Sequence, residues 1–186
     1  MNLARTLAAS AASLLFSAAQ AFPIAEPGTE GYRVVVSSTD PVVATYQGTS
    51  ASYSNDHYLN GVFIFNNQTT PWGSTADLGS YAVGTELVFE LRVQNTGYSY
   101  YTGPASRNPD GFAHARVQAE WVPGSTLVSF EDLYGGSFDY NDLSFSFTNT
   151  VSSPVPEPGT WGLLLAGLGG VAWVARSRRG GAGGLR

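Results

Sequence analysis

The sequence predicts an all-β protein, a single antiparallel β-sandwich of about seven or eight strands between an N-terminal signal helix and a C-terminal transmembrane helix. Residues 85–93 and 143–148 alternate apolar and polar side chains, as half-buried strands do. Turn-forming Gly, Asn and Pro residues separate the candidate strands, and no segment of the middle shows the 3.6-residue period of a helix. The lack of an internal repeat argues against a propeller or a solenoid.

The order of these segments predicts the domain organisation. From the N-terminus, we expect a signal peptide (1–21), a disordered Pro/Gly-rich lead-in (22–31), the sandwich domain (32–150), a Pro/Ser linker (151–159), a transmembrane helix (160–175) and an Arg-rich cytoplasmic tail (176–186). Within the domain, strands are expected at 32–37, 42–46, 58–65, 85–93, 112–122, 126–131 and 143–148, with long loops at 66–84 and 95–111.

Composition excludes several classes of function. The chain has no Cys, so disulfides, thiolate zinc sites and cysteine nucleophiles are impossible. Residues 22–155 contain four arginines against thirteen acids, a net charge of -9. Such a domain repels nucleic acid and attracts cations, so we expect no nucleic-acid partner.

The N-terminal segment has the features of a secretory signal peptide. Arg5 precedes a short Ala/Leu-rich run that ends in Ala19-Gln20-Ala21, an A-x-A site that predicts cleavage after Ala21. The alternative, an uncleaved membrane anchor, is disfavoured because the run is short and rich in small residues.

The C-terminal segment has the features of a membrane anchor. Trp161–Ala175 is 15 residues without a charge, and a helix of this length spans about 22 Å against a bilayer core of about 30 Å. Trp161 and Trp173 lie near its two ends, as aromatic interface residues do. The charges that would hold the tail on the cytoplasmic side follow at Arg176, Arg178 and Arg179.

Pro156, Glu157 and Pro158, followed by the apolar run and the Arg cluster, resemble the PEP-CTERM sorting signal of Gram-negative bacteria over residues 154–179. The resemblance implies processing by an exosortase, a membrane cysteine protease that cuts near the Pro-Glu-Pro motif. It implies export through the inner membrane, transient anchoring there, and then a cell-surface or extracellular location. It also suggests exopolysaccharide as a partner, because such proteins are common in bacteria that make biofilm matrix.

An acidic loop between two strands is the main candidate site. It carries Glu131, Asp132, Asp139, Asn141 and Asp142, with no basic residue nearby in the sequence. Two carboxylates about 5 Å apart repel by about 3 kcal/mol at an effective dielectric constant of about 20, which a bound cation would offset. These hard oxygen donors, with two glycines for the bend, predict a Ca²⁺ site that is not an EF-hand. The alternative is a solvated turn whose side chains cap backbone amides. Further oxygens from Asn108 and Asp110 are a weaker expectation.

The same loop carries a second resemblance. F-E-D-L-Y-G-G-S-F-D-Y-N-D resembles the signature of a bacterial extracellular domain of unknown function, which is found in PEP-CTERM proteins and large adhesins. We extend this resemblance over roughly residues 32–150. Ser137 stands where the signature often has another Asp, which removes one potential ligand.

Other candidate chemistry is weaker. We expect His57 and His114 to be structural or exposed, because there is no G-x-S-x-G motif and no evident nucleophile. Glu131 and Asp132 as adjacent strand residues would point to opposite faces, which argues against a glycosidase pair. We therefore predict no catalytic residues. Four aromatic residues in long loops could form a platform for sugars or close the end of the core: Trp72, Tyr98, Tyr100 and Tyr101.

Taken together, these patterns predict a non-enzymatic exported protein of the cell surface or extracellular matrix. Its expected role is adhesion or organisation of an exopolysaccharide or biofilm matrix, with Ca²⁺ stabilising the acidic loop. The alternatives are a carbohydrate-binding module and, behind it, an extracellular hydrolase.

Overall fold

The computed structural model describes residues 21–155 and three residues of the C-terminal segment, Ala166, Leu168 and Val171, which are helical. Of the predicted signal-cleavage site only Ala21 is described. The Pro-Glu-Pro motif, the Arg cluster and most of the predicted transmembrane helix lie outside the described residues. In this described part, no helix is both long and apolar enough to cross a membrane.

The prediction of an all-β domain is confirmed. The described residues form twelve strands, with one short 3-10 helix at Ala105–Arg107. The strands are β1 (Arg33–Val36), β2 (Val43–Gly48), β3 (Asn55–Leu59), β4 (Val62–Asn66), β5 (Thr75–Asp77), β6 (Glu86–Leu87), β7 (Phe89–Val93), β8 (Ser99–Tyr101), β9 (Ala115–Gln118), β10 (Ser125–Phe130), β11 (Leu143–Thr148) and β12 (Thr150–Ser153). They are shorter and more numerous than the seven or eight expected.

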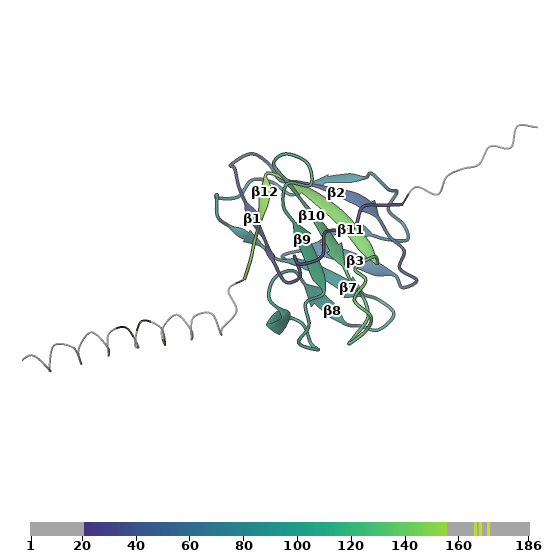
Figure 1. The fold of residues 1–186 in the computed structure, drawn as a ribbon. Helices are drawn as coiled ribbons and strands as arrows, with labels where there is room; N and C mark the ends of the chain where they lie inside the picture. The colour runs from purple at the N-terminus through teal and green to yellow at the C-terminus, as the bar shows by residue number, and fades with distance from the viewer. Residues whose placement is uncertain (1–20, 156–165, 167, 169–170, 172–186) are drawn as a thin grey trace, which may run out of the picture.

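The strands make three antiparallel sheets, in the orders β5-β2-β11-β10-β9, β4-β3-β7-β8 and β12-β1-β6. In Figure 1, β9, β10 and β11 lie side by side, and β3, β7 and β8 belong to the other large sheet. The two large sheets pack face to face through aromatic rings. The His57 ring centroid lies 3.9 Å from that of Phe145, and the centroids of Phe89 and Phe147 are 4.0 Å apart. This face-to-face packing is the arrangement that a sandwich requires.

The apolar side chains of β11 face the core, as the alternating pattern of the strand predicts. Leu143, Phe145 and Phe147 are fully buried in the core cluster, as predicted. The opposite, serine-bearing face is also covered, because Ser144 is fully buried and its hydroxyl hydrogen-bonds to that of Ser129 at 2.7 Å. The sheet is therefore covered on both sides at this position.

Residues 22–31 provide part of that cover, which corrects the prediction of a disordered lead-in. Ala25 is buried, and its backbone N–H donates to Ser129 Oγ at 2.8 Å. Glu30 pairs with Arg116 on β9 at 2.7 Å. The Pro/Gly composition that suggested disorder instead lets the segment turn across the outer face of β9 and β10.

The start of this segment fits against a glycine. Gly48 has a φ of 139°, and a Cβ built there would lie 2.6 Å from Cβ of Phe22, which in turn packs edge-on against Trp72. We expect Gly48→Ala to displace Phe22 and lower the free energy of unfolding by about 1–3 kcal/mol. Urea unfolding would measure the loss, and limited proteolysis would report faster cleavage of residues 22–31.

Gly79→Ala is the matched control, because Gly79 also has a positive φ, 84°, but open space around its Cα. If both variants lost the same stability and were cleaved at the same rate, contact with Phe22 would not be what restricts position 48.

Several strand predictions are corrected. The expected strand at 58–65 is a hairpin, because Asn60 and Gly61 adopt φ values of 52° and 77° and form the turn between β3 and β4. The expected strand at 85–93 changes sheets: β6 pairs with β1 and β7 pairs with β3. The two expected loops contain β5 and β8, and β12 extends the sheets into the predicted linker as far as Ser153.

A candidate divalent-cation site

The acidic loop is positioned by the pairing of β10 with β11. Phe130, the last residue of β10, lies opposite Leu143, the first residue of β11. Glu131 and Asp132 follow Phe130 directly, and Asp142 directly precedes Leu143. The register of the two strands therefore brings acids from the two ends of the loop together.

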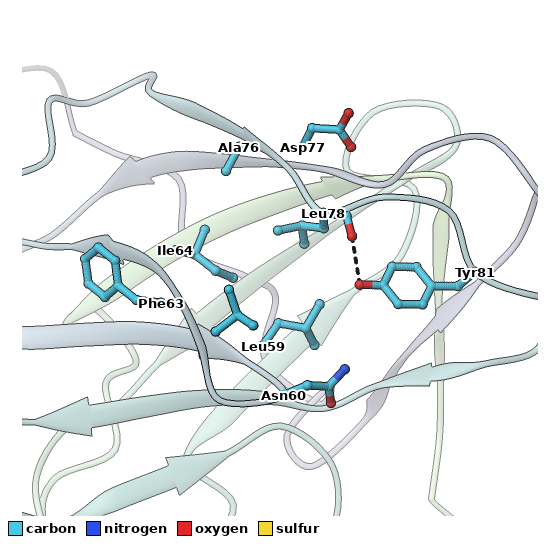
Figure 2. Close-up of a pocket in the computed structure, with 9 residues that line it drawn as sticks. Leu59, Asn60, Phe63, Ile64, Ala76, Asp77, Leu78 and Tyr81 are labelled. Atoms are coloured by element: carbon cyan, nitrogen blue, oxygen red, sulfur yellow. Dashed lines mark hydrogen bonds between the residues drawn. The ribbon is translucent and has the colours of Figure 1, made fainter.

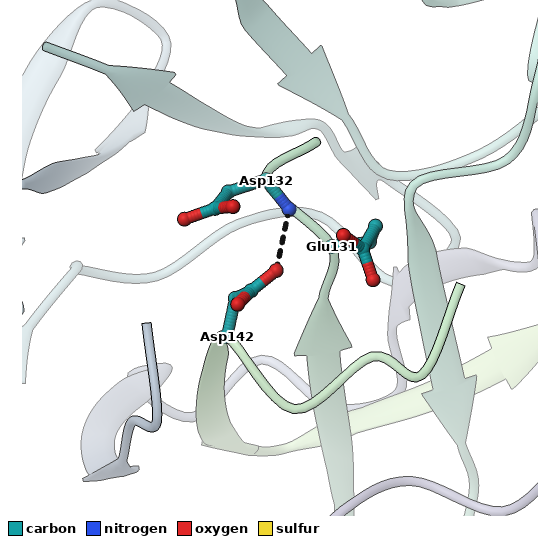
Figure 3. A group of neighbouring side chains, drawn as sticks. All are labelled: Glu131, Asp132 and Asp142. Atoms are coloured by element: carbon teal, nitrogen blue, oxygen red, sulfur yellow. Dashed lines mark hydrogen bonds between the residues drawn. The ribbon is translucent and has the colours of Figure 1, made fainter. Parts of the chain in front are cut away.

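Glu131, Asp132 and Asp142 form the acidic cluster. One carboxylate oxygen of each lies within 4.8 Å of the others, and Figure 3 shows Asp142 directed at the backbone nitrogen of Asp132. Glu131 is 1% exposed and Asp132 is 3% exposed. The argument that adjacent acids point apart does not hold at this position, because β10 ends at Phe130 and residues 131–132 are no longer strand.

Hydrogen bonds hold each carboxylate in place. Asp142 Oδ2 accepts from the backbone N–H of Asp132 at 2.7 Å, and Asp132 Oδ2 accepts from Asn55 Nδ2 at 2.7 Å. The carboxylate of Glu131 accepts from the backbone N–H groups of three loop residues, Leu133, Asp139 and Tyr140. The cluster is thus fixed by β3 and by its own loop.

Its electrostatics are unfavourable without a counter-charge. Burial raises the pKa of Asp142 to about 8, and the neighbouring charges of Asp132 and Glu131 add to the rise. Burial likewise raises the pKa values of Glu131 and Asp132. Among the described residues, no arginine forms an ion pair with any of the three. The cluster therefore favours either a shared proton or a bound cation near neutral pH.

The other two predicted ligands do not converge with these three. Asp139 accepts a hydrogen bond from Asn141 Nδ2 at 2.7 Å. The backbone carbonyl and side-chain oxygens of Asn141 both accept from the hydroxyl of Ser50. Asp139 is also exposed. The structure thus gathers three of the five expected ligands.

Asn108 and Asp110 have other partners. Asn108 Oδ1 accepts from the backbone N–H of Tyr101 at 2.8 Å. Asp110 Oδ2 lies 2.8 Å from Nε2 of buried His114 and accepts from the backbone N–H of Gly135 at 2.9 Å. Burial by itself would raise the pKa of Asp110, but these hydrogen bonds outweigh it and leave that pKa lowered. Asp110 supports the acidic loop from outside the cluster.

His114 links Asp110 to the end of β10. Its Nε2 faces the Asp110 carboxylate, and its Nδ1 lies 2.9 Å from the backbone carbonyl oxygen of Glu131. Both ring nitrogens of His114 therefore lie within hydrogen-bond distance of an oxygen atom. With both nitrogens engaged, His114 holds the loop in position.

Tyr140 anchors the loop on β9. Its ring lies under the guanidinium of Arg116, 4.2 Å from ring centroid to Cζ, and its hydroxyl donates to the carbonyl of Ala113 at 2.8 Å. Local sequence pattern does not predict this anchor, because Arg116 and Ala113 are distant from Tyr140 in the chain and are brought near it only by the fold.

The predicted aromatic platform is divided between different places. Tyr100 is fully buried, whereas Tyr98 is exposed and stacks on Tyr134 with ring centroids 4.8 Å apart. Trp72 contacts Phe22 instead. Tyr101 lies on β8, across from Glu90 of β7. These four side chains do not form one surface.

The hollows on the described surface include two that bear on the candidate sites. One, of about 240 Å³, lies between the β3–β4 hairpin and the segment after β5. Figure 2 shows the aliphatic side chains of Leu59, Ile64 and Leu78 meeting there, with the Tyr81 hydroxyl bonded to the Leu78 carbonyl. The other, of about 270 Å³, includes Asp132 and Asp142 in its lining. Of these two, the second adjoins the acidic cluster and the first does not.

Residues 154–179 match the family model described as the PEP-CTERM protein-sorting motif, which confirms the first resemblance. Comparison with curated proteins and with solved structures finds no match. The resemblance of the acidic loop to an extracellular domain of unknown function stays a prediction. The chain therefore carries a PEP-CTERM sorting motif, which implies export, processing by an exosortase-type protease, transient membrane anchoring and a cell-surface or extracellular location.

Proposed function

We propose that the protein is a non-enzymatic component of the cell surface or extracellular matrix whose β-sandwich is stabilised by Ca²⁺ at the acidic cluster. The observation that carries this proposal is the convergence of three largely buried carboxylates within 4.8 Å of one another on an exported domain. Buried charges of one sign need a counter-charge, and no described arginine or histidine forms an ion pair with any of the three carboxylates.

Calcium suits this donor set better than other metals. Glu131, Asp132 and Asp142 offer hard oxygen ligands, and no histidine belongs to the cluster. Ca²⁺ takes six to eight oxygens in flexible geometry and binds extracellular modules in the range of about 10⁻⁴–10⁻³ M. The net charge of -9 on residues 22–155 also favours accumulation of a divalent cation near the domain.

The proposed role in adhesion or matrix organisation rests on two features, the sorting motif and the β-sandwich fold. The sorting motif takes the domain outside the cytoplasm, where a cation-stiffened sandwich can present loops to a surface or to matrix polymers. The proposal includes no catalysis, because His57 lies in the apolar core and both nitrogens of His114 are engaged by Asp110 and Glu131. The alternative of an extracellular hydrolase has no specific support from this geometry.

The test is calorimetry of the exported protein with EDTA and with calcium. At a calcium concentration of about 100 times Kd, we expect a gain of about 2.7 kcal/mol, which raises Tm by about 10 °C. Asp142→Asn should abolish the calcium-dependent part of this rise, because it removes one ligand charge from the cluster.

Asp139→Asn is the matched control, since Asp139 belongs to the same loop but is exposed and bonded only to Asn141 on its side chain. It should keep the full calcium-dependent rise. Identical melting with EDTA and with calcium would show that the cluster holds a proton instead, and the calcium proposal would be abandoned.

A further inference from the structure

The acidic cluster opens to the surface on one side. Asp132 and Asp142 form part of the lining of a hollow of about 270 Å³, whose other lining residues are Ser50, Ser52, Tyr53 and Leu133. Glu131 does not line the hollow and is almost fully buried. A cation held by the three carboxylates would therefore have protein on the Glu131 side and the hollow on the other side.

A buried oxygen beside the cluster also lacks a partner. The amide of Asn55 faces Asp132, to which its Nδ2 donates at 2.7 Å, and Asn55 is fully buried. Its Oδ1 has no hydrogen-bond partner among the described residues. An unpartnered buried oxygen costs about 1–3 kcal/mol, so its presence on the side chain that contacts Asp132 points to a bound group that the protein chain does not itself supply.

The coordination count leaves room for a ligand. Ca²⁺ takes six to eight oxygens, and the three carboxylates already accept hydrogen bonds from Asn55 and from loop amides, which limits how many oxygens they can offer. The remaining positions would face the hollow. Water would fill them in the free protein, and a pair of neighbouring hydroxyl groups on a ligand could displace that water.

The lining indicates which ligand fits. The lining residues include Ser50 and Ser52, which carry hydroxyl groups, and Tyr53 and Leu133, which carry largely apolar side chains. The Ser50 hydroxyl already donates to Asn141, so it can only accept from a ligand. Among these lining residues none is cationic, and the surrounding domain is strongly anionic. A neutral polyhydroxyl ligand therefore suits the hollow better than an anionic one, which would be repelled.

We propose that this hollow is a calcium-dependent binding site for a neutral glycan, in which two adjacent sugar hydroxyls coordinate the ion and one apolar sugar face packs on Tyr53. This inference rests on the calcium site proposed above and names its ligand class. It places carbohydrate recognition at Tyr53, outside the group of Trp72, Tyr98, Tyr100 and Tyr101 that the sequence suggested.

The test is affinity electrophoresis of the exported protein through gels that contain mannan or dextran as neutral probes, or alginate as an acidic probe. We expect retardation by a neutral probe in calcium and its loss in EDTA. Tyr53→Ala should abolish retardation while keeping the calcium-dependent rise in Tm. Tyr134→Ala is the matched control, because Tyr134 is 53% exposed and does not line the hollow.

The outcomes separate the two proposals. A calcium-dependent rise in Tm without retardation by either neutral probe would overturn the glycan site and leave the calcium site standing. No rise in Tm would overturn both. Retardation that persists in EDTA, or that is confined to alginate, would contradict a neutral sugar bound through the ion. Equal loss of retardation in Tyr53→Ala and Tyr134→Ala would move the binding surface away from the hollow.

Discussion

Replacing His57 with leucine is expected to stabilise the protein, and the gain is expected to grow as the pH falls. His57 is fully buried, and its ring stacks on Phe145 with centroids 3.9 Å apart. Neither ring nitrogen has a hydrogen-bond partner among the described residues. Each unsatisfied buried polar group costs about 1–3 kcal/mol, and leucine of similar volume removes both.

The pH dependence follows from titration. Burial lowers the pKa of His57 from 6.5 to about 3. Between these values the unfolded chain binds a proton at this histidine and the folded chain does not, so stability falls as the pH falls below 6.5. The slope is about 1.4 kcal/mol per pH unit, so the advantage of His57→Leu should increase by about 3 kcal/mol between pH 7 and pH 4.5.

Urea unfolding at the two pH values would measure this difference. His57→Gln separates the causes, because glutamine does not titrate but stays polar: it should flatten the pH dependence without the gain at pH 7. Parallel stability curves for the wild type and His57→Leu would show that His57 is protonated or hydrated in the folded protein, contrary to its position in the core.

Phe145→Ala is expected to lower the free energy of unfolding by about 3–5 kcal/mol, because it leaves a large cavity between the two main sheets. Phe145 is fully buried at the centre of an aromatic cluster, with its ring centroid 5.4 Å from that of Tyr46 and 5.9 Å from that of Phe65. β11 begins directly after Asp142 of the acidic cluster. Because the cavity should loosen the pairing of β11 with β10, we also expect Phe145→Ala to weaken calcium binding.

Chemical denaturation would measure the loss of stability, and calorimetry the calcium response. Phe145→Leu should lose less stability than Phe145→Ala, because leucine fills more of the space that the phenylalanine ring occupied. Phe63→Ala is the surface control: Phe63 is 52% exposed on β4, and its truncation should change stability by less than about 1 kcal/mol. Similar losses for positions 63 and 145 would argue against face-to-face packing of the two sheets at Phe145.

Local sequence patterns were sufficient to predict the strands whose apolar and polar residues alternate clearly. Leu87, Phe89, Leu91 and Val93 all point into the core as their spacing predicts, although the chain changes sheets at Val88. The short strands β5 and β8 were missed, because runs of three residues carry no period that can be recognised. The Asn60-Gly61 turn had a recognisable signal in the sequence, since Asn-Gly favours the positive φ values of a tight hairpin.

The sequence by itself determined that the chain is all-β, that it carries a PEP-CTERM sorting motif, and that acids are concentrated in one loop. Only the tertiary structure decided which of these acids meet. Glu131, Asp132 and Asp142 converge because β10 and β11 pair with Phe130 opposite Leu143, and Asn55 joins them from β3. Asp139 has the same chemistry but faces solvent. The side-chain period assigns residues to a face of one strand, whereas a shared site depends on register and sheet packing between distant segments, which local pattern does not encode.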